Sequence, residues 1–186
     1  KEFNIPHKVF QLDWLRDITT TSLVNKKASI PIITIEDLDN QEKLKETCKQ
    51  VWVPNRNGVF INIAAAFAEQ FGHQYILTGF NKEESLTFID NSAEFIDAIN
   101  KSLSLSTSNK VKVVSYVENL SKNEILKLGI SLNIPIRFIW SCYDGKDKMC
   151  GLCESCQRLI KAMELNNYSE KDLIKKIEKL PPALIR

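Results

Sequence analysis

The sequence has no long apolar run, no basic tract and no acidic tail. Its apolar runs are short and interrupted, which excludes a transmembrane helix of about 20 residues. The formal net charge of +2 indicates neither a nucleic-acid partner nor a charged membrane surface. The opening residues KEFNIPHKVF lack the apolar core of a signal peptide. We therefore expect a cytoplasmic protein with no direct nucleic-acid or membrane partner.

Glycine is scarce as well, and no two glycines are adjacent. A glycine-rich loop that cradles a phosphate therefore cannot be built from this sequence. With 186 residues, 44% of them hydrophobic and 26% charged, the chain is suited to one substantial globular domain with room for a small appendage. The six glycines are at positions 58, 72, 79, 129, 145 and 151.

Apolar segments of strand type alternate with segments of helical periodicity along the chain. This alternation predicts parallel βαβ units and an α/β fold, with an open parallel sheet covered by helices on both faces. Ser121 and Glu124 have the spacing of a capping box at the start of one helix. The predicted strands are 9–12, 75–78, 110–117 and 134–140, and the predicted helices are 40–50, 59–71, 93–103, 120–132, 156–165 and 169–180.

Four of the five cysteines are gathered in the stretch SCYDGKDKMCGLCESC. Two overlapping C-x2-C steps allow neighbouring thiolates to converge on one tetrahedral ion, and Gly151 permits the tight turn between them. Because four thiolates leave no open coordination position, we predict one structural Zn²⁺ per chain that cannot activate water. The predicted ligands are Cys142, Cys150, Cys153 and Cys156.

Three other interpretations of this cluster compete with structural zinc. A redox pair needs only two cysteines, and disulfides are disfavoured in a reducing cytoplasm. An iron–sulfur cluster also uses four cysteines, and the spacing alone leaves that alternative open. The fifth cysteine, Cys48, is distant in the sequence and is not assigned to the site.

Together with the motifs WSCY, VPNRN and LSKNEILKLG, the cysteine cluster makes residues 5–165 resemble the 7-cyano-7-deazaguanine synthase family. The resemblance implies a Rossmann-like fold of the adenine-nucleotide α-hydrolase type, with a C-terminal zinc-binding helical appendage. It also implies ATP-dependent conversion of 7-carboxy-7-deazaguanine and ammonia to 7-cyano-7-deazaguanine through an adenylated carboxylate. That reaction supplies the precursor of queuosine and archaeosine in tRNA, with ATP and Mg²⁺ entering as substrate. A homodimer is a further expectation.

On this basis residues 1–140 are predicted to form the α/β nucleotide and substrate domain. Residues 141–186 are predicted to form the zinc knuckle and C-terminal helices, packed on the same domain. The family's Ser-Gly-Gly-x-Asp-Ser phosphate loop is not in this sequence. We interpret this as an N-terminal strand and loop that lie upstream of Lys1. The alternative is a non-catalytic, zinc-stabilised binding subunit.

A second departure from the family lies in the stretch GFNKEESLTFIDNSAEF. Many bacterial members have Tyr, Pro and Cys where this chain has Phe88, Ile89 and Asn91. The change resembles an archaeal-type branch, or else indicates a related carboxylate substrate. Another amidating or tRNA-thiolating enzyme of the same ATP-pyrophosphatase class is the alternative.

Four further residues are candidates for substrate or nucleotide binding, whereas no catalytic residue is assigned. Arg56 and Asn57 stand in the VPNRN motif, where a guanidinium can pair with a phosphate or a carboxylate. The alternative is an exposed arginine followed by a helix-capping asparagine. Glu83 and Asp90 follow a predicted strand, where they could bind Mg²⁺ or a purine-like edge. The alternative for them is a solvated acidic loop.

Overall fold

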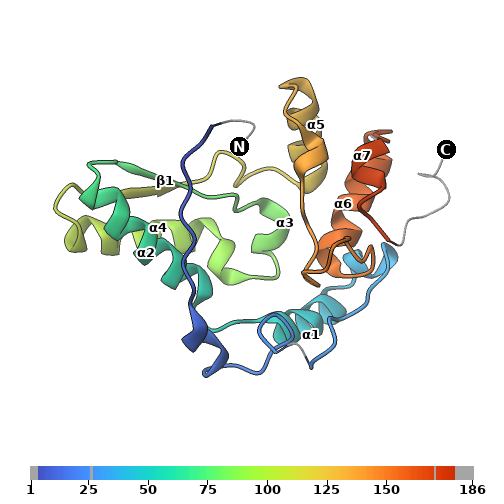
Figure 1. The fold of residues 1–186 in the computed structure, drawn as a ribbon, viewed down its shortest axis with the longest axis horizontal. Coiled ribbons are helices and arrows are strands. Elements are labelled where there is room, and N and C mark those ends of the chain that lie inside the picture. Colours follow the sequence, from blue (N-terminus) through green and yellow to red (C-terminus); the bar gives the residue numbers. More distant parts are fainter. Residues whose placement is uncertain (1–3, 26, 170, 179–186) are drawn as a thin grey trace.

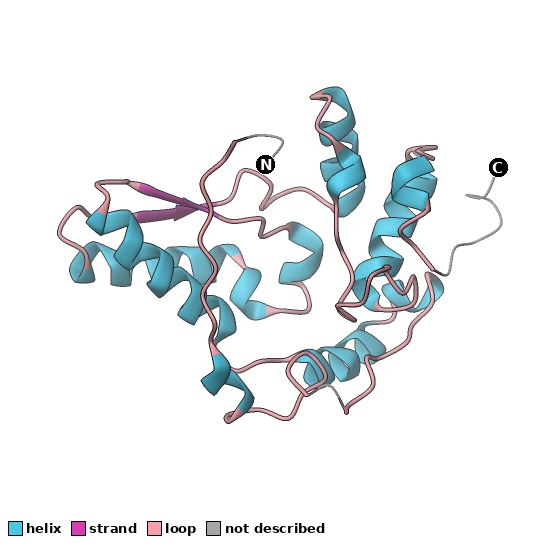
Figure 2. Ribbon diagram, viewed as in Figure 1, coloured by secondary structure: helices cyan, strands magenta, loops and turns pink. Residues whose placement is uncertain are grey.

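The computed structural model describes residues 4–25, 27–169 and 171–178 (Figure 1). It is rich in helices and contains one parallel pair of strands within these residues (Figure 2). The irregular end that the sequence predicts at 181–186 lies outside them. No helix in the described part of the chain is both long and apolar enough to cross a bilayer.

The elements follow one another from short 3-10 turns through helices α1 and α2 to the strand pair and then to the helices of the cysteine region. In chain order they are η1 (Asp13–Arg16), η2 (Glu36–Asp39), α1 (Gln41–Val51), α2 (Arg56–Gln70), β1 (Tyr75–Leu77), α3 (Lys82–Ser85), η3 (Ile89–Asn91), α4 (Ala93–Ser106), β2 (Lys112–Val114), α5 (Lys122–Ser131), η4 (Ile136–Phe138), α6 (Glu154–Leu165) and α7 (Lys171–Ile174).

Strands β1 and β2 are parallel, and Ile76 is opposite Val113 in their register. Helix α2 contacts β1 and helix α4 contacts β2, so that the two helices and the strand pair share one apolar core. The side chain of Asn100 on α4 donates to the carbonyl of Val113 at 2.9 Å and accepts from its N–H at 2.7 Å. The side chain thus pairs with the backbone N–H and carbonyl on the edge of β2 that faces away from β1, as a further strand would. The core residues are Ile61, Ala65, Ala68, Leu103, Val111 and Val113.

Two of the predicted strands are wrong. Residues 9–12 are not assigned to a strand, pair with no other strand among the described residues, and leave Val9 82% exposed. Residues 134–140 contain the 3-10 turn η4 instead, where Phe138 N–H donates to the Pro135 carbonyl at 3.0 Å. Pro135 has no N–H to give to a sheet, so this segment satisfies its backbone locally.

A second core surrounds the cysteines and is formed by α5, α6, α7 and η4 (Figure 1). The capping box predicted at Ser121 and Glu124 is confirmed at the start of α5. The backbone of Met149 accepts from Glu178 and donates to the carbonyl of Lys176, so the segment after α7 closes over the cysteine loop. The described part of the last predicted helix is shorter than expected, since α7 spans Lys171–Ile174. The domain boundary at 140/141 stays a prediction.

Candidate functional site

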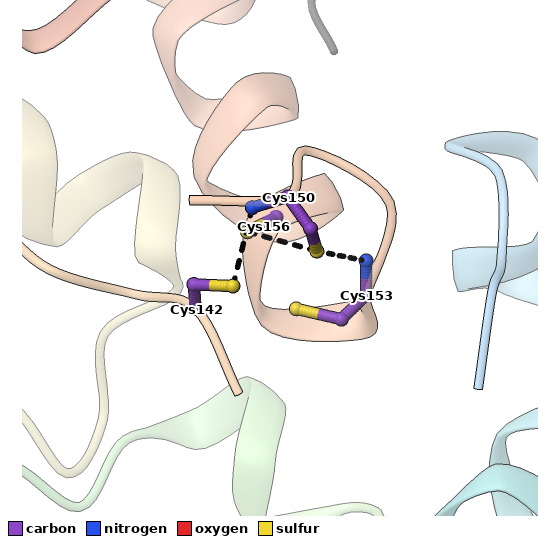
Figure 3. Close-up of side chains that lie close together, drawn as sticks. All are labelled: Cys142, Cys150, Cys153 and Cys156. Carbon is purple, nitrogen blue, oxygen red and sulfur yellow. Dashed lines mark hydrogen bonds between the residues drawn. The ribbon is translucent and has the colours of Figure 1, made fainter. Parts of the chain in front are cut away.

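The four clustered cysteines converge on one point. Their sulfur atoms all lie within 4.8 Å of one another, and Figure 3 shows the side chains turned toward a common centre. Zn–S bonds of about 2.3 Å in a tetrahedron require sulfurs about 3.8 Å apart, so a single zinc ion fits this group. Sulfurs this close suit one ion better than a larger iron–sulfur cluster. Cys142 and Cys150 are half-buried, whereas Cys153 and Cys156 are buried.

Backbone amides point at the cysteine sulfurs. The N–H groups of Asp144 and Cys150 donate to Cys142 Sγ at 3.3 and 3.2 Å. Those of Leu152 and Cys153 donate to Cys150 Sγ at 3.4 and 3.3 Å. Such donors stabilise negative charge on sulfur and orient metal ligands. The site is therefore organised for thiolates.

Tight turns and a helix start bring the four cysteines together. Gly151 has a φ of +73° and Gly145 a φ of +63°, conformations in which a residue with a side chain is strained. Cys153 is the N-cap residue of α6, and Cys156 lies in its first turn. Free N–H groups at a helix N-terminus favour thiolate over thiol.

Hydrogen bonds and burial shift the pKa values of the cysteine thiols in different directions. A hydrogen bond from Cys156 lowers the pKa of Cys153 to about 5, and the same bond raises the pKa of Cys156. Burial raises the pKa of Cys150 to about 11. A bound cation would displace these shared protons, because metal binding requires thiolates. With all four positions filled by protein, the ion would hold the fold and not activate water.

The structure brings Arg56, Asn57 and Asp90 together at the start of α2. The buried Asn57 side chain donates to the Asp90 carbonyl at 3.2 Å and to Asn91 Oδ1 at 3.0 Å. Asn57 therefore does not cap the helix, whose N-cap residue is Asn55. Burial raises the pKa of the Asp90 carboxyl, while the neighbouring Arg56 charge opposes this rise. Together they place a cation and a buried acid next to each other.

Glu83 is placed differently from the other three candidates. Its Oε1 accepts from the Lys122 N–H at 2.9 Å, and its Oε2 accepts from Arg158 Nη1 at 2.9 Å. Both oxygens thus have protein partners at the junction of α3, α5 and α6. Sequence reasoning missed Arg158 and its second partner Glu154, although their i,i+4 spacing on α6 was a visible signal.

A family model described as queuosine biosynthesis protein QueC matches residues 1–167. The chain belongs to the QueC family. The comparisons with curated proteins agree. A protein of Carboxydothermus hydrogenoformans is 54% identical over 86% of this chain and 74% of its own length. A protein of Bdellovibrio bacteriovorus is 47% identical over 94% of this chain and 76% of its own length. A protein of Methanosarcina mazei is 44% identical over 92% of this chain and 75% of its own length. All three are named 7-cyano-7-deazaguanine synthase.

QueC membership confirms the resemblance seen in the cysteine, WSCY and VPNRN motifs. It makes the protein an enzyme of the synthase type and assigns it to queuosine-precursor biosynthesis. The α/β fold with a parallel sheet and a four-cysteine cluster is confirmed as well. The archaeal-type branch stays a prediction.

Proposed function

We propose that this QueC protein converts 7-carboxy-7-deazaguanine and ammonia to 7-cyano-7-deazaguanine with the use of ATP. The observation that carries the proposal is an identity of up to 54% with proteins named for that product. The nitrile would enter queuosine, or archaeosine in an archaeal setting. The substrates are small molecules, and a homodimer is part of the proposal, testable by light scattering.

The chemistry requires that the acid lose both carboxylate oxygens. Adenylation turns one oxygen into part of an AMP leaving group and releases pyrophosphate. Ammonia then attacks the acyl carbon and displaces AMP, which gives an amide. A second ATP adenylates the amide oxygen and releases pyrophosphate, and the nitrogen loses its two protons as AMP leaves, which gives the nitrile. Each activation needs a cation beside the carboxylate or the phosphates, since negative charge builds up there.

Arg56 and Asp90 are the residues we propose to contact the substrates. A guanidinium can pair bidentately with the acid's carboxylate or with an ATP phosphate. Asp90 can accept hydrogen bonds from the purine-like edge or bind the Mg²⁺ that accompanies ATP. Asn57 holds the Asp90 segment at the start of α2 through the two hydrogen bonds described above. We propose that Glu83 holds this segment in place and does not contact the substrates, because both of its carboxylate oxygens already accept hydrogen bonds from the protein.

The four-cysteine site is proposed to hold one structural Zn²⁺. Cys142, Cys150, Cys153 and Cys156 would supply all four ligands, and the metal would contribute to folding. Free thiols that serve as ligands require a reducing compartment, which favours the cytoplasm.

The phosphate loop is a further part of the proposal. Beside β1 lies an apolar groove of about 570 Å³ between residues 8–12 and helix α2, lined by Phe10, Phe60 and Phe67 among others. Two-stranded parallel sheets are unusual, since parallel strands are normally buried within larger sheets. We propose that the family's first strand occupies this groove in the full-length protein and carries the Ser-Gly-Gly-x-Asp-Ser loop to the site.

An activity assay tests the reaction. The full-length gene product is incubated with ATP, Mg²⁺, ammonium and 7-carboxy-7-deazaguanine, and the products are separated by mass spectrometry. We expect the nitrile together with AMP and pyrophosphate. Absence of nitrile, amide and AMP would refute the proposal, and use of ATP with tRNA alone would favour a tRNA-modifying enzyme of the same class.

A further inference from the structure

Arg158 links the cysteine site to a segment far away in the sequence. It lies on α6 two positions after Cys156, and its side chain is only 7% exposed. Its Nε and Nη2 donate to Glu154 Oε1 at 3.1 and 2.9 Å, and its Nη1 donates to Glu83 Oε2 at 2.9 Å. A buried guanidinium is stable only when it is paired in this way. One side chain thus joins the helix of the cysteines to α3.

Glu154 depends on that arginine. It stands between Cys153 and Cys156 in the sequence, is 4% exposed, and has a second oxygen, Oε2, that is buried without a hydrogen-bond partner in the described part of the chain. Arg158 therefore supplies the charge-assisted hydrogen bonds of this carboxylate. A lysine is a poor replacement, because its compact ammonium lacks the planar fork with which Arg158 makes three hydrogen bonds to two carboxylates.

Glu83 extends the connection to a third helix. While Oε2 binds Arg158, Oε1 accepts from the backbone N–H of Lys122 at the N-terminus of α5. A carboxylate is favoured at this end of a helix. The position of α3 is consequently set by α5 and α6, the two helices that pack over the cysteine core.

From α3 the connection continues to the start of α2 through a short hydrogen-bonded path. The N–H of Phe88 donates to the Glu84 carbonyl at 2.7 Å, and that of Asn91 donates to the Phe88 carbonyl at 3.0 Å. Asn57 then holds Asp90 and Asn91 with its side-chain amide. A shift of α3 would therefore be passed on to Asp90.

We propose that Arg158 is a positioning residue, which makes the geometry of the segment 82–91 depend on the four-cysteine centre. Zinc in this protein then does more than stabilise one end of the fold, because it sets the place of Asp90 through α6 and Glu83. What the positioned segment binds rests on the proposed function, whereas the coupling itself does not.

Hydrogen–deuterium exchange on the zinc-loaded full-length protein tests the coupling. We expect Arg158→Met and Glu83→Gln each to speed amide exchange in residues 82–91 about tenfold or more, with zinc content unchanged. The double variant should be no worse than the more severe single one, because both changes break the same connection. In the activity assay the KM for the deazapurine acid should rise in both variants.

Lys161→Met is the matched control. Lys161 is on the same helix, and its Nζ pairs with the exposed Asp39 of η2 at 3.2 Å. The proposal is overturned if exchange in 82–91 stays at the wild-type rate in Arg158→Met or Glu83→Gln, or rises equally in the control. If Arg158→Met does not fold, Glu83→Gln alone decides the question. If the wild type makes no nitrile, the proposed function fails while the exchange result still stands.

Discussion

At the scale of single residues, burial determines what Asp90 can do. Its side chain is 9% exposed, and burial raises the pKa of its carboxyl above the ordinary value of 3.8 despite the nearby Arg56. The folded protein thus holds this proton more tightly than the unfolded chain does. A hydrogen-bond donor of the substrate or a metal ion would stabilise the ionised form of this carboxyl, since an unpaired buried charge is costly.

The Asp90 carboxyl should make stability fall as pH rises. Above pH 3.8 the unfolded chain loses this proton first, so stability declines until the raised folded-state pKa is passed and is then level. Asp90→Asn should remove this loss. Between pH 3.8 and the raised pKa, the free energy of unfolding of the variant should therefore increase with pH relative to that of the wild type. Urea unfolding at a series of pH values measures the difference. Asp97→Asn, at an exposed position on α4, provides the baseline, and a pH-independent gap for Asp90→Asn would contradict the prediction.

At the scale of elements, local signals predicted most of the helices. The helices α2, α4, α5 and α6 lie where apolar periodicity and caps placed them, and the strands β1 and β2 fall inside the predicted segments. The strands predicted at 9–12 and 134–140 are wrong because a strand needs a neighbouring strand to pair with, and apolar content alone does not provide one. In the second of these, Pro135 also favours a turn.

In the candidate site too, local patterns were predictable and contacts between distant residues were not. The cysteine cluster was predictable because its ligands lie within 15 residues and their spacing carries the geometry. Asn57 and Asp90 were predicted separately, one from a motif and the other from a strand end, and their contact was not predicted. The ion pair of Arg158 with Glu83 joins residues 75 positions apart, and no local pattern specifies such a pairing.

The capping box of α5 supports a quantitative prediction. Ser121 Oγ accepts from the Glu124 N–H at 3.3 Å, and the Glu124 side chain accepts from the Ser121 N–H at 2.7 Å. Ser121→Ala should lower the free energy of unfolding by about 1 kcal/mol, because an N–H at the helix start loses its acceptor. Ser104→Ala, in the last turns of α4, should change it far less. Equal effects of the two changes in urea unfolding would show that the cap is not a stabilising contact.

At the scale of the whole molecule, one of the apolar cores of the described residues is built around the proposed metal. Cys153 and Cys156 are 1% exposed and pack with Met149, Ile160 and Met163. The ion would thus act as a central part of that core. Loss of the metal would leave the thiols of Cys153 and Cys156 buried in this core without the ion that joins them.

Metal analysis should therefore find about one zinc per chain. Cys150→Ser should lose the zinc and unfold the region of α5, α6 and α7, because a structural metal contributes folding free energy directly. Elemental analysis and circular dichroism measure the two effects. Cys48→Ser, at a buried cysteine outside the cluster, should keep the metal. A Cys150→Ser protein that stays folded and loses only activity would argue against a structural metal.

The closing contact of Met149 has a consequence for synthesis. Its backbone groups bond to Lys176 and Glu178, which follow α6 and α7 in the chain. A growing polypeptide leaves the ribosome from its N-terminus, so all four cysteines emerge before the segment that covers them. The newly made knuckle thus stays open on one side until Glu178 has itself left the ribosome, and an incoming ion has that interval in which to enter.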